Sequence, residues 1–96
     1  MLGRKKKERT IDADFSGVCF KPCGIKRLDL QSVELNEDEM EAIRLSDFEE
    51  LYQQECADKM GISRTTFSRL VQSARKKISD ALLNKKALKI KGAKWI

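Results

Sequence analysis

The stretch QQECADKMGISRTTFSRLVQ, residues 53–72, decides the fold of this chain. It places a small residue, Ala57, where two helices would approach closely, and a glycine, Gly61, four residues later. Close approach needs a small side chain and the turn needs left-handed backbone, so this spacing predicts a helix-turn-helix. An ordinary helical hairpin with the same turn is the alternative. Apolar side chains fill the positions between the two helices: Cys56, Met60, Ile62, Phe67 and Leu70.

The helix after this turn has the most regular pattern in the chain. Ser63 is a favourable N-cap residue, and apolar residues then recur at helical spacing, which predicts a helix over about residues 64–84. We expect this helix to bury Phe67, Val71, Ala74 and Ile78. At about 100° per residue, a polar and basic stripe lies on the opposite face. Its members are Thr65, Ser68, Arg69, Gln72 and Lys76.

An earlier helix is predicted over about residues 37–48. Asn36 is its N-cap, and Glu39 stands where its side chain can reach back to the Asn36 N–H in a capping box. Leu35 and Met40 can form a hydrophobic staple across this start. The apolar residues do not follow one narrow stripe, which predicts a helix buried on two sides. They are Met40, Ala42, Ile43, Leu45 and Phe48.

The remaining segments complete one small domain, residues 10–96, behind a basic flexible arm, residues 1–9. A shorter helix is expected over about residues 53–59. Residues 10–35 are expected to be irregular with β-prone pieces at 18–20 and 32–35, and a further strand is expected near residues 88–90. The fold class is therefore mainly α, a helix-turn-helix DNA-binding domain flanked by short β-strand segments.

Charge is unevenly distributed along the 96 residues, which together carry a net charge of +5. Residues 34–58 hold ten acids and one base, whereas residues 59–96 hold eleven bases and one acid. An asymmetry of this size favours a polyanionic partner for the C-terminal third. The alternative is an acidic face that pairs with a basic face inside the domain or an oligomer.

Several functional classes are disfavoured by composition. The chain has no histidine, glycine-rich phosphate loop or nucleophile–base pair, so we expect no enzyme and no cofactor. The chain has three cysteines, Cys19, Cys23 and the distant Cys56, which are too few for a tetrahedral zinc site within one chain. We therefore expect no metal. A site shared between subunits, or a redox switch, stays open as an alternative. We expect Cys56 to be a core residue.

The chain lacks a transmembrane-length apolar run and a secretory signal, which predicts a cytoplasmic protein without a membrane partner.

Residues 42–78, from Ala42-Ile43-Arg44-Leu45 to Ala74-Arg75-Lys76-Lys77-Ile78, resemble region four of bacterial sigma factors, which reads promoter DNA. The whole chain resembles a small prokaryotic family of uncharacterised, predicted DNA-binding proteins with this motif. The cues are Gly3-Arg4-Lys5-Lys6, Phe20-Lys21-Pro22-Cys23-Gly24, the stretch 39–47 and Lys86-Ala87-Leu88-Lys89-Ile90. Two positions depart from the sigma-like pattern: Glu50 replaces a favoured glycine, and Tyr52 replaces a Ser or Thr cap.

These features predict a sequence-specific double-stranded DNA-binding protein, a transcriptional regulator with its third helix in the major groove. Base contacts are assigned to Thr65, Ser68, Arg69 and Gln72, and phosphate contacts to Arg64, Arg75, Lys76 and Lys77. The alternative is a protein-interaction adaptor that contacts the transcription machinery, such as RNA polymerase, without reading DNA itself.

We also expect a homodimer or a higher symmetric oligomer, because one small helix-turn-helix contacts few base pairs. The first helix, the strands near residues 18–20 and 88–90, and the terminal residues Trp95 and Ile96 are the candidate interface material.

Overall fold

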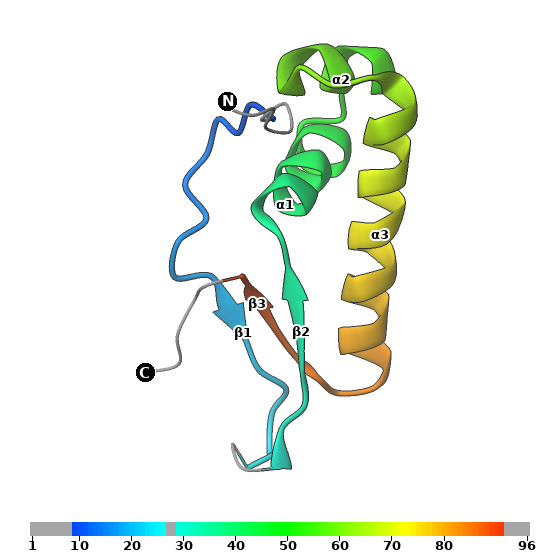
Figure 1. Ribbon diagram of the computed structural model, residues 1–96. Coiled ribbons are helices and arrows are strands. Elements are labelled where there is room, and N and C mark those ends of the chain that lie inside the picture. The colour runs from blue at the N-terminus through cyan, green and yellow to red at the C-terminus, as the bar shows by residue number, and fades with distance from the viewer. Residues whose placement is uncertain (1–8, 27–28, 92–96) are drawn as a thin grey trace, which may run out of the picture.

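A computed structural model describes residues 9–26 and 29–91 of the chain. Its helices are α1 (Glu37–Ile43), the π-helical segment η2 (Arg44–Phe48), α2 (Gln53–Met60) and α3 (Arg64–Leu83), and its strands are β1 (Cys19–Phe20), β2 (Ser32–Leu35) and β3 (Ala87–Ile90). In Figure 1, α3 runs along one side, α2 lies across its N-terminal end, and the sheet lies toward the other end. The prediction of a mainly α fold with short flanking strands is confirmed.

The turn between α2 and α3 has the predicted backbone. Gly61 ends α2 in the left-handed region, with φ 68°. The N–H of Ile62 donates to the Ala57 carbonyl at 3.1 Å, which satisfies an end carbonyl of α2. Ser63 then caps α3, because its Oγ accepts the Thr66 N–H at 3.0 Å. Gly61 and Ser63 therefore determine where one helix ends and the next begins.

The helix predicted over about residues 37–48 has the expected bounds, but its last five residues are not α-helical. α1 begins as expected, with the Asn36 N–H donating to Glu39 Oε1 at 2.9 Å, but a π-helical segment replaces the α-helix from Arg44 to Phe48. Phe48, the last residue of this segment, lies outside the core with its side chain 79% exposed. Burial of Phe48, which the sequence pattern suggested, is thus wrong.

Two apolar clusters form the core, and α1 lies between them. The first cluster contains Ala42 and Leu45 with residues of α2 and α3, namely Cys56, Ala57, Met60, Phe67 and Val71. The second contains Phe15, Leu35, Ala74 and Ile90, with Met40 and Ile78 packed against it. The prediction that the first helix is buried on two sides is confirmed for its apolar residues other than Phe48.

The sheet has the strand order β1-β3-β2. β1 pairs with β3 in antiparallel fashion, with Cys19 opposite Lys89, whereas β2 pairs with β3 in parallel, with Leu35 opposite Ile90. The parallel pairing requires the chain to cross over between β2 and β3, and α1, η2, α2 and α3 form that connection. The sheet therefore joins the segment before α1 to the end of α3.

Residues 1–8 of the predicted basic arm, as well as Trp95 and Ile96, lie outside the described residues. Among the helices in the described ranges, none has the length and apolar character needed to cross a membrane.

Candidate nucleic-acid interface

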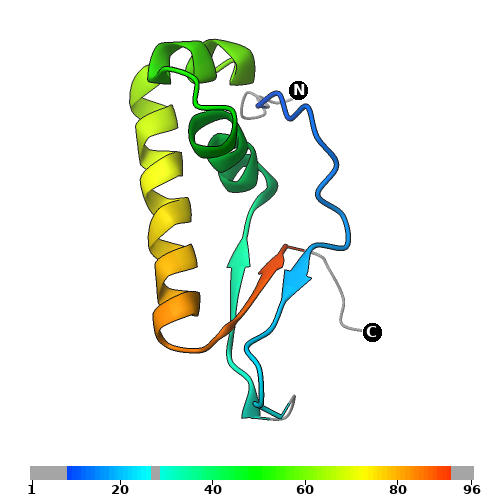
Figure 2. The same cartoon turned by 180° about the vertical axis from the view of Figure 1, so that it is seen from behind.

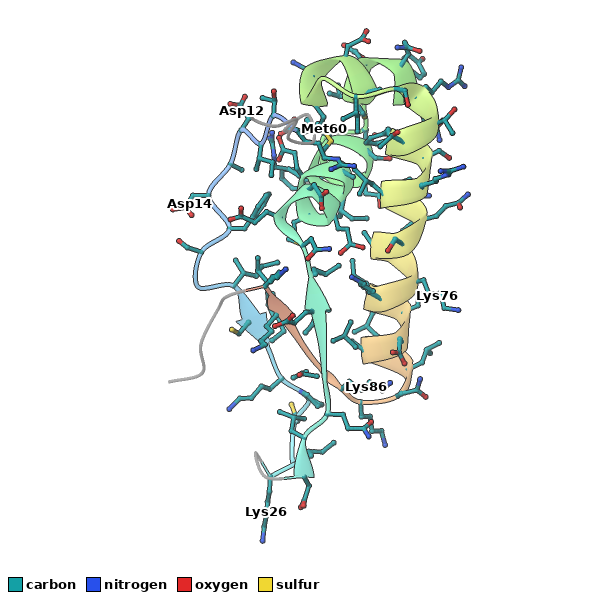
Figure 3. The ribbon with its side chains drawn as sticks, in the orientation of Figure 1. Asp12, Asp14, Lys26, Met60, Lys76 and Lys86 are labelled. Carbon is teal, nitrogen blue, oxygen red and sulfur yellow. The ribbon has the colours of Figure 1, made fainter. Side chains whose placement is uncertain are left out.

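The predicted polar stripe lies on the face of α3 that points away from α1. Thr65, Arg69, Gln72 and Lys76 are exposed, and Ser68 is half-buried. The opposite face buries Phe67, Val71 and Ala74 against the core. Figure 3 shows the Lys76 side chain directed away from the body of the molecule. The structure thus brings the five stripe residues together along one side of α3.

Arg64 lies where the start of α3 meets the start of α2. Its side chain is exposed, and its Nε lies 3.5 Å from Oε1 of Gln53, the first residue of α2. Tyr52 at the N-cap of α2 makes no side-chain cap hydrogen bond and is exposed. The absence of a capping side chain, indicated by the departure at Tyr52, is therefore confirmed.

Arg75 lies beside the stripe and pairs with an acidic residue of η2. Its Nη2 lies 2.6 Å from Asp47 Oδ1, and its Nε donates to Asp47 Oδ2 at 3.2 Å. The hydrogen bonds from Arg75 hold the pKa of the Asp47 carboxyl below its usual range. About half of the Arg75 side chain stays exposed, so it combines a surface position with a partner inside the chain.

Lys77 is the predicted phosphate contact that the structure places apart from the others. Its Nζ lies 2.8 Å from Oε1 of Glu39, a carboxylate on α1 that is almost fully buried. Ser73 also donates to this carboxylate from α3. Burial opposes ionisation of Glu39, yet the hydrogen bonds from Asn36, Lys77 and Ser73 together lower its pKa. Lys77 therefore fastens α3 to α1.

The acidic and basic segments are thus partly paired within the domain. Two ion pairs join the segment of α1 and η2 to α3, namely Glu39–Lys77 and Asp47–Arg75. Sequence reasoning missed Glu39 and Asp47 as partners of these bases, although charge asymmetry alone leaves an internal pairing of acidic and basic faces open. The stripe residues Arg69 and Lys76 do not take part in these two pairs.

An open cleft of about 580 Å³ lies at the first turn of α3. Its lining joins Arg9 from the N-terminal segment to the turn and to the start of α3. The lining residues are Arg9, Ala57, Asp58, Gly61, Ile62, Ser63 and Thr66.

The cysteines are dispersed across the fold. Cys19 is half-buried in β1, Cys23 is exposed, and Cys56 is fully buried in the first apolar cluster, which confirms its expected core position. Burial raises the pKa of the Cys56 thiol. Within residues 9–26 and 29–91, no three His, Cys, Asp or Glu side chains are grouped to hold a metal ion.

The family described as "Protein of unknown function DUF134" matches residues 1–96. UPF0251 protein TTE1845 of Caldanaerobacter subterraneus subsp. tengcongensis is 47% identical over 94 residues, which cover 98% of this chain and 80% of the relative. UPF0251 protein Teth514_1147 of Thermoanaerobacter sp. (strain X514) is 45% identical, with 98% and 83% covered. UPF0251 protein CT0950 of Chlorobaculum tepidum is 44% identical, with 96% and 60% covered. No solved structure matches the chain.

Proposed function

The chain belongs to the family described as protein of unknown function DUF134, and we propose that this member is a sequence-specific double-stranded DNA-binding protein that regulates transcription. The predicted membership of a small family of uncharacterised prokaryotic proteins is confirmed. The family description names no activity, so the proposal depends on the residues that α3 exposes at its surface.

The observation that carries the proposal is the solvent-exposed stripe on α3 opposite the face that packs on α2. In a helix-turn-helix protein, the second helix enters the major groove and its outer residues reach the base edges. α2 and α3 are joined by a short turn, and Phe67 on the inner face belongs to the same cluster as Ala57 of α2. The outer face of α3 is exposed, and the major groove of DNA has room for one helix.

Within this proposal, Arg69 and Gln72 read bases from the middle of the stripe. Arginine pairs with the O6 and N7 acceptors of guanine, and glutamine pairs with N6 and N7 of adenine. Thr65 and Ser68 lie one turn closer to the start of α3 and are placed near the groove floor. The phosphates on either side of the groove are then held by Arg64, Arg75 and Lys76. Lys77 is assigned to stabilising the α1–α3 contact instead, because its ammonium group is bound to Glu39.

A second candidate function is the adaptor that contacts the transcription machinery without reading DNA. The observation that favours it is a pair of exposed aromatic side chains, Phe48 and Tyr52, in the connection between α1 and α2. The exposed carboxylates Glu49 and Glu50 lie between them in the sequence. Exposed aromatic side chains are enriched in protein–protein interfaces. RNA polymerase is the partner that this alternative proposes.

We further propose that two copies of the chain associate. An apolar groove of about 330 Å³ lies where β1 and β3 meet the end of α3, lined in part by Phe20, Leu82 and Leu88. Phe20 is 64% exposed and Leu82 is 74% exposed, although both are large apolar side chains. The groove lies at the end of α3 away from the α2–α3 turn, so a second copy seated there leaves the start of the stripe open.

Salt-dependent binding to DNA tests the proposal and separates its two candidate functions. A labelled pool of genomic DNA fragments is titrated with the full chain at several salt concentrations. A DNA-binding protein of this kind binds at low salt, and its affinity falls steeply as salt rises. Absence of any shifted fragment at low salt contradicts DNA binding and favours the adaptor.

A further inference from the structure

Arg75 is held from one side by the π-helical segment η2. Its Nε donates to Asp47 Oδ2 at 3.2 Å, and its Nη2 donates to Asp47 Oδ1 at 2.6 Å and to Ser46 Oγ at 3.4 Å. A side-on contact through two nitrogens fixes both the position and the plane of a guanidinium group. Among the contacts within residues 9–26 and 29–91, none involves Nη1 of Arg75, so the two N–H groups of this nitrogen stay available to a ligand.

Asp47 is a fixed partner because its segment is anchored in the core. Leu45, two residues earlier, is 3% exposed and belongs to the first apolar cluster, and its carbonyl accepts the Leu51 N–H at 3.1 Å. Figures 1 and 2 both show the connection from α1 to α2 lying beside α3. Short π-helical segments are rare in proteins and often lie at functional sites. Asp47 therefore belongs to a supported segment whose geometry is typical of such sites.

Stability alone does not account for this ion pair. The Arg75 side chain is 53% exposed and the Asp47 side chain is 40% exposed. Exposed ion pairs are screened by water and salt, so they contribute little to the free energy of unfolding. Arg75 follows Gln72 by three positions and directly precedes Lys76, so it lies beside the stripe on the same side of α3. Its position therefore favours a role in binding at the stripe.

The contact with Asp47 changes what Arg75 can do beside DNA. An unrestrained arginine in this position pairs with any phosphate within reach, which strengthens binding to every sequence alike. The carboxylate of Asp47 offsets the charge of Arg75 and leaves Nη1 to reach a phosphate in one direction. Binding specificity is a difference between two affinities, so weaker binding to random sequences increases it.

We propose that Asp47 determines sequence specificity by holding Arg75 in one orientation, in which its Nη1 meets a DNA phosphate only when α3 lies in the groove of the preferred sequence. This inference rests on the proposed DNA-binding function. Arg75 touches the phosphate, and Asp47 is a positioning residue that acts through Arg75.

Asp47→Asn tests the inference, because asparagine keeps the shape of the side chain and removes its charge. The preferred duplex is selected from a random pool with the native chain, and a random duplex of equal length is the comparison. On the random duplex, the variant should show a slope of log affinity against log salt that is steeper by about 0.9, the value for one more neutralised phosphate. The ratio of the two affinities should fall by roughly 2- to 10-fold, since an unrestrained Arg75 side chain must be ordered on binding.

Three further variants show whether Asp47 acts through Arg75. Asp47→Glu keeps the carboxylate and should keep the native slope. Glu55→Gln removes an exposed carboxylate of α2 that does not bind Arg75, and it should leave the affinity ratio unchanged. Arg75→Gln removes the guanidinium, so adding Asp47→Asn to it should change neither the slope nor the ratio further.

The results that overturn the inference differ from those that overturn the proposed function. An unchanged slope and ratio in Asp47→Asn, with the native chain binding DNA, overturns the inference and leaves the proposed function standing. An equal effect of Glu55→Gln, or an undiminished effect in the Arg75→Gln background, also overturns it. Loss of the helices in Asp47→Asn, seen by circular dichroism, overturns it too, because the pair is then structural. Failure of the native chain to bind any DNA overturns both.

Discussion

The ammonium nitrogen of Lys77 lies 2.8 Å from Oε1 of Glu39, a carboxylate that is only 3% exposed. The two residues are 38 positions apart in the sequence, and their contact joins α3 to the start of α1. The neighbouring Lys76 points away from the body of the molecule (Figure 3). Two consecutive lysines of one helix therefore have different surroundings. Replacing each in turn should separate an effect on stability from an effect on the proposed DNA binding.

Replacing Lys77→Met is expected to lower the free energy of unfolding by about 2 kcal/mol. The substitution leaves the buried Glu39 carboxylate without its cation, and an uncompensated buried charge is costly. The value is set below that of a fully buried pair because a third of the Lys77 side chain is exposed. Urea unfolding followed by circular dichroism measures the change.

Lys76→Met is the matched control for that variant. Its side chain is exposed, so the free energy of unfolding should change by less than about 0.5 kcal/mol. In a salt titration of DNA binding, the Lys76 variant should instead show a slope that is smaller by about 0.9, the value for one phosphate. Equal stability of the two variants contradicts the structural role assigned to Lys77.

Acid should destabilise the protein through Glu39, Glu41 and Asp47. The hydrogen bond from Arg44 lowers the pKa of Glu41 despite its burial, and the pKa values of Glu39 and Asp47 are also lowered. A carboxyl whose pKa is lower when folded contributes stability above its unfolded pKa. For Glu39 and Glu41, that contribution is lost as the pH falls below the ordinary glutamate pKa of 4.5 and passes through the folded pKa. For Asp47, the loss begins below the ordinary aspartate pKa of 3.8.

The measurement is the free energy of unfolding against pH, for the native chain and for Glu41→Gln. The glutamine keeps the shape of the side chain but does not titrate, so the decrease in stability below pH 4.5 should be shallower. Identical curves for the two proteins contradict a native-state pKa lowered at Glu41.

Glu50→Gly is expected to stabilise the protein by about 0.5–1 kcal/mol. Glu50 has φ 60°, in the left-handed region that strains a side chain with a Cβ, and glycine adopts it freely. Glu49→Gly is the control, because Glu49 has an ordinary right-handed backbone, with φ −82°. Thermal unfolding of both variants decides the point: glycine should raise the melting temperature at residue 50 and not at residue 49.

The sequence predicts the parts of this fold that depend on local rules. Ser63 and Asn36 have side chains that cap helices, and Gly61 tolerates left-handed backbone. The predicted helix boundaries therefore lie within about one residue of the observed ones, and only the π-helical geometry of Arg44–Phe48 was not predicted. The sigma-like pattern favours glycine at residue 50, which indicates the strained backbone that Glu50 has.

What the sequence does not reveal depends on contacts between distant residues. Nothing near Arg44 marks the change to a π-helical segment, in which the Glu49 N–H donates to the Arg44 carbonyl five residues earlier. The charges of Glu39 and Lys77 are evident, but their pairing depends on how α1 crosses α3. The stripe on α3 could be predicted because helical periodicity alone places it, whereas the ion pair of Lys77 with the buried Glu39 could not.

Replacing Arg69→Ala should cost about 1–3 kcal/mol of binding to the preferred site and relax specificity at one base pair. The exposed guanidinium lies in the middle of the stripe, where bidentate contact with guanine is possible. Competition binding against duplexes that vary at each position measures both effects. Lys76→Ala is the control and should weaken binding evenly across sequences. An even loss for Arg69→Ala places this residue among the phosphate contacts.

A second copy of the chain should occupy the apolar groove beside Phe20 and Leu82. Light scattering at micromolar concentration should then give about 22 kDa, twice the 11.0 kDa of one chain. Leu82→Lys places a charge in the groove and should return the mass to that of a monomer, because burying an unpaired ammonium group is costly.

The neighbouring residue supplies the control for the groove. Leu83 is 79% exposed, as apolar as Leu82, and not among the residues that line the groove. Leu83→Lys adds the same charge one position away, so a dimer seated in the groove should tolerate it. If both variants dissociate equally, the interface covers more of α3 than the groove. A mass for the native chain that stays at 11.0 kDa as concentration rises contradicts self-association altogether.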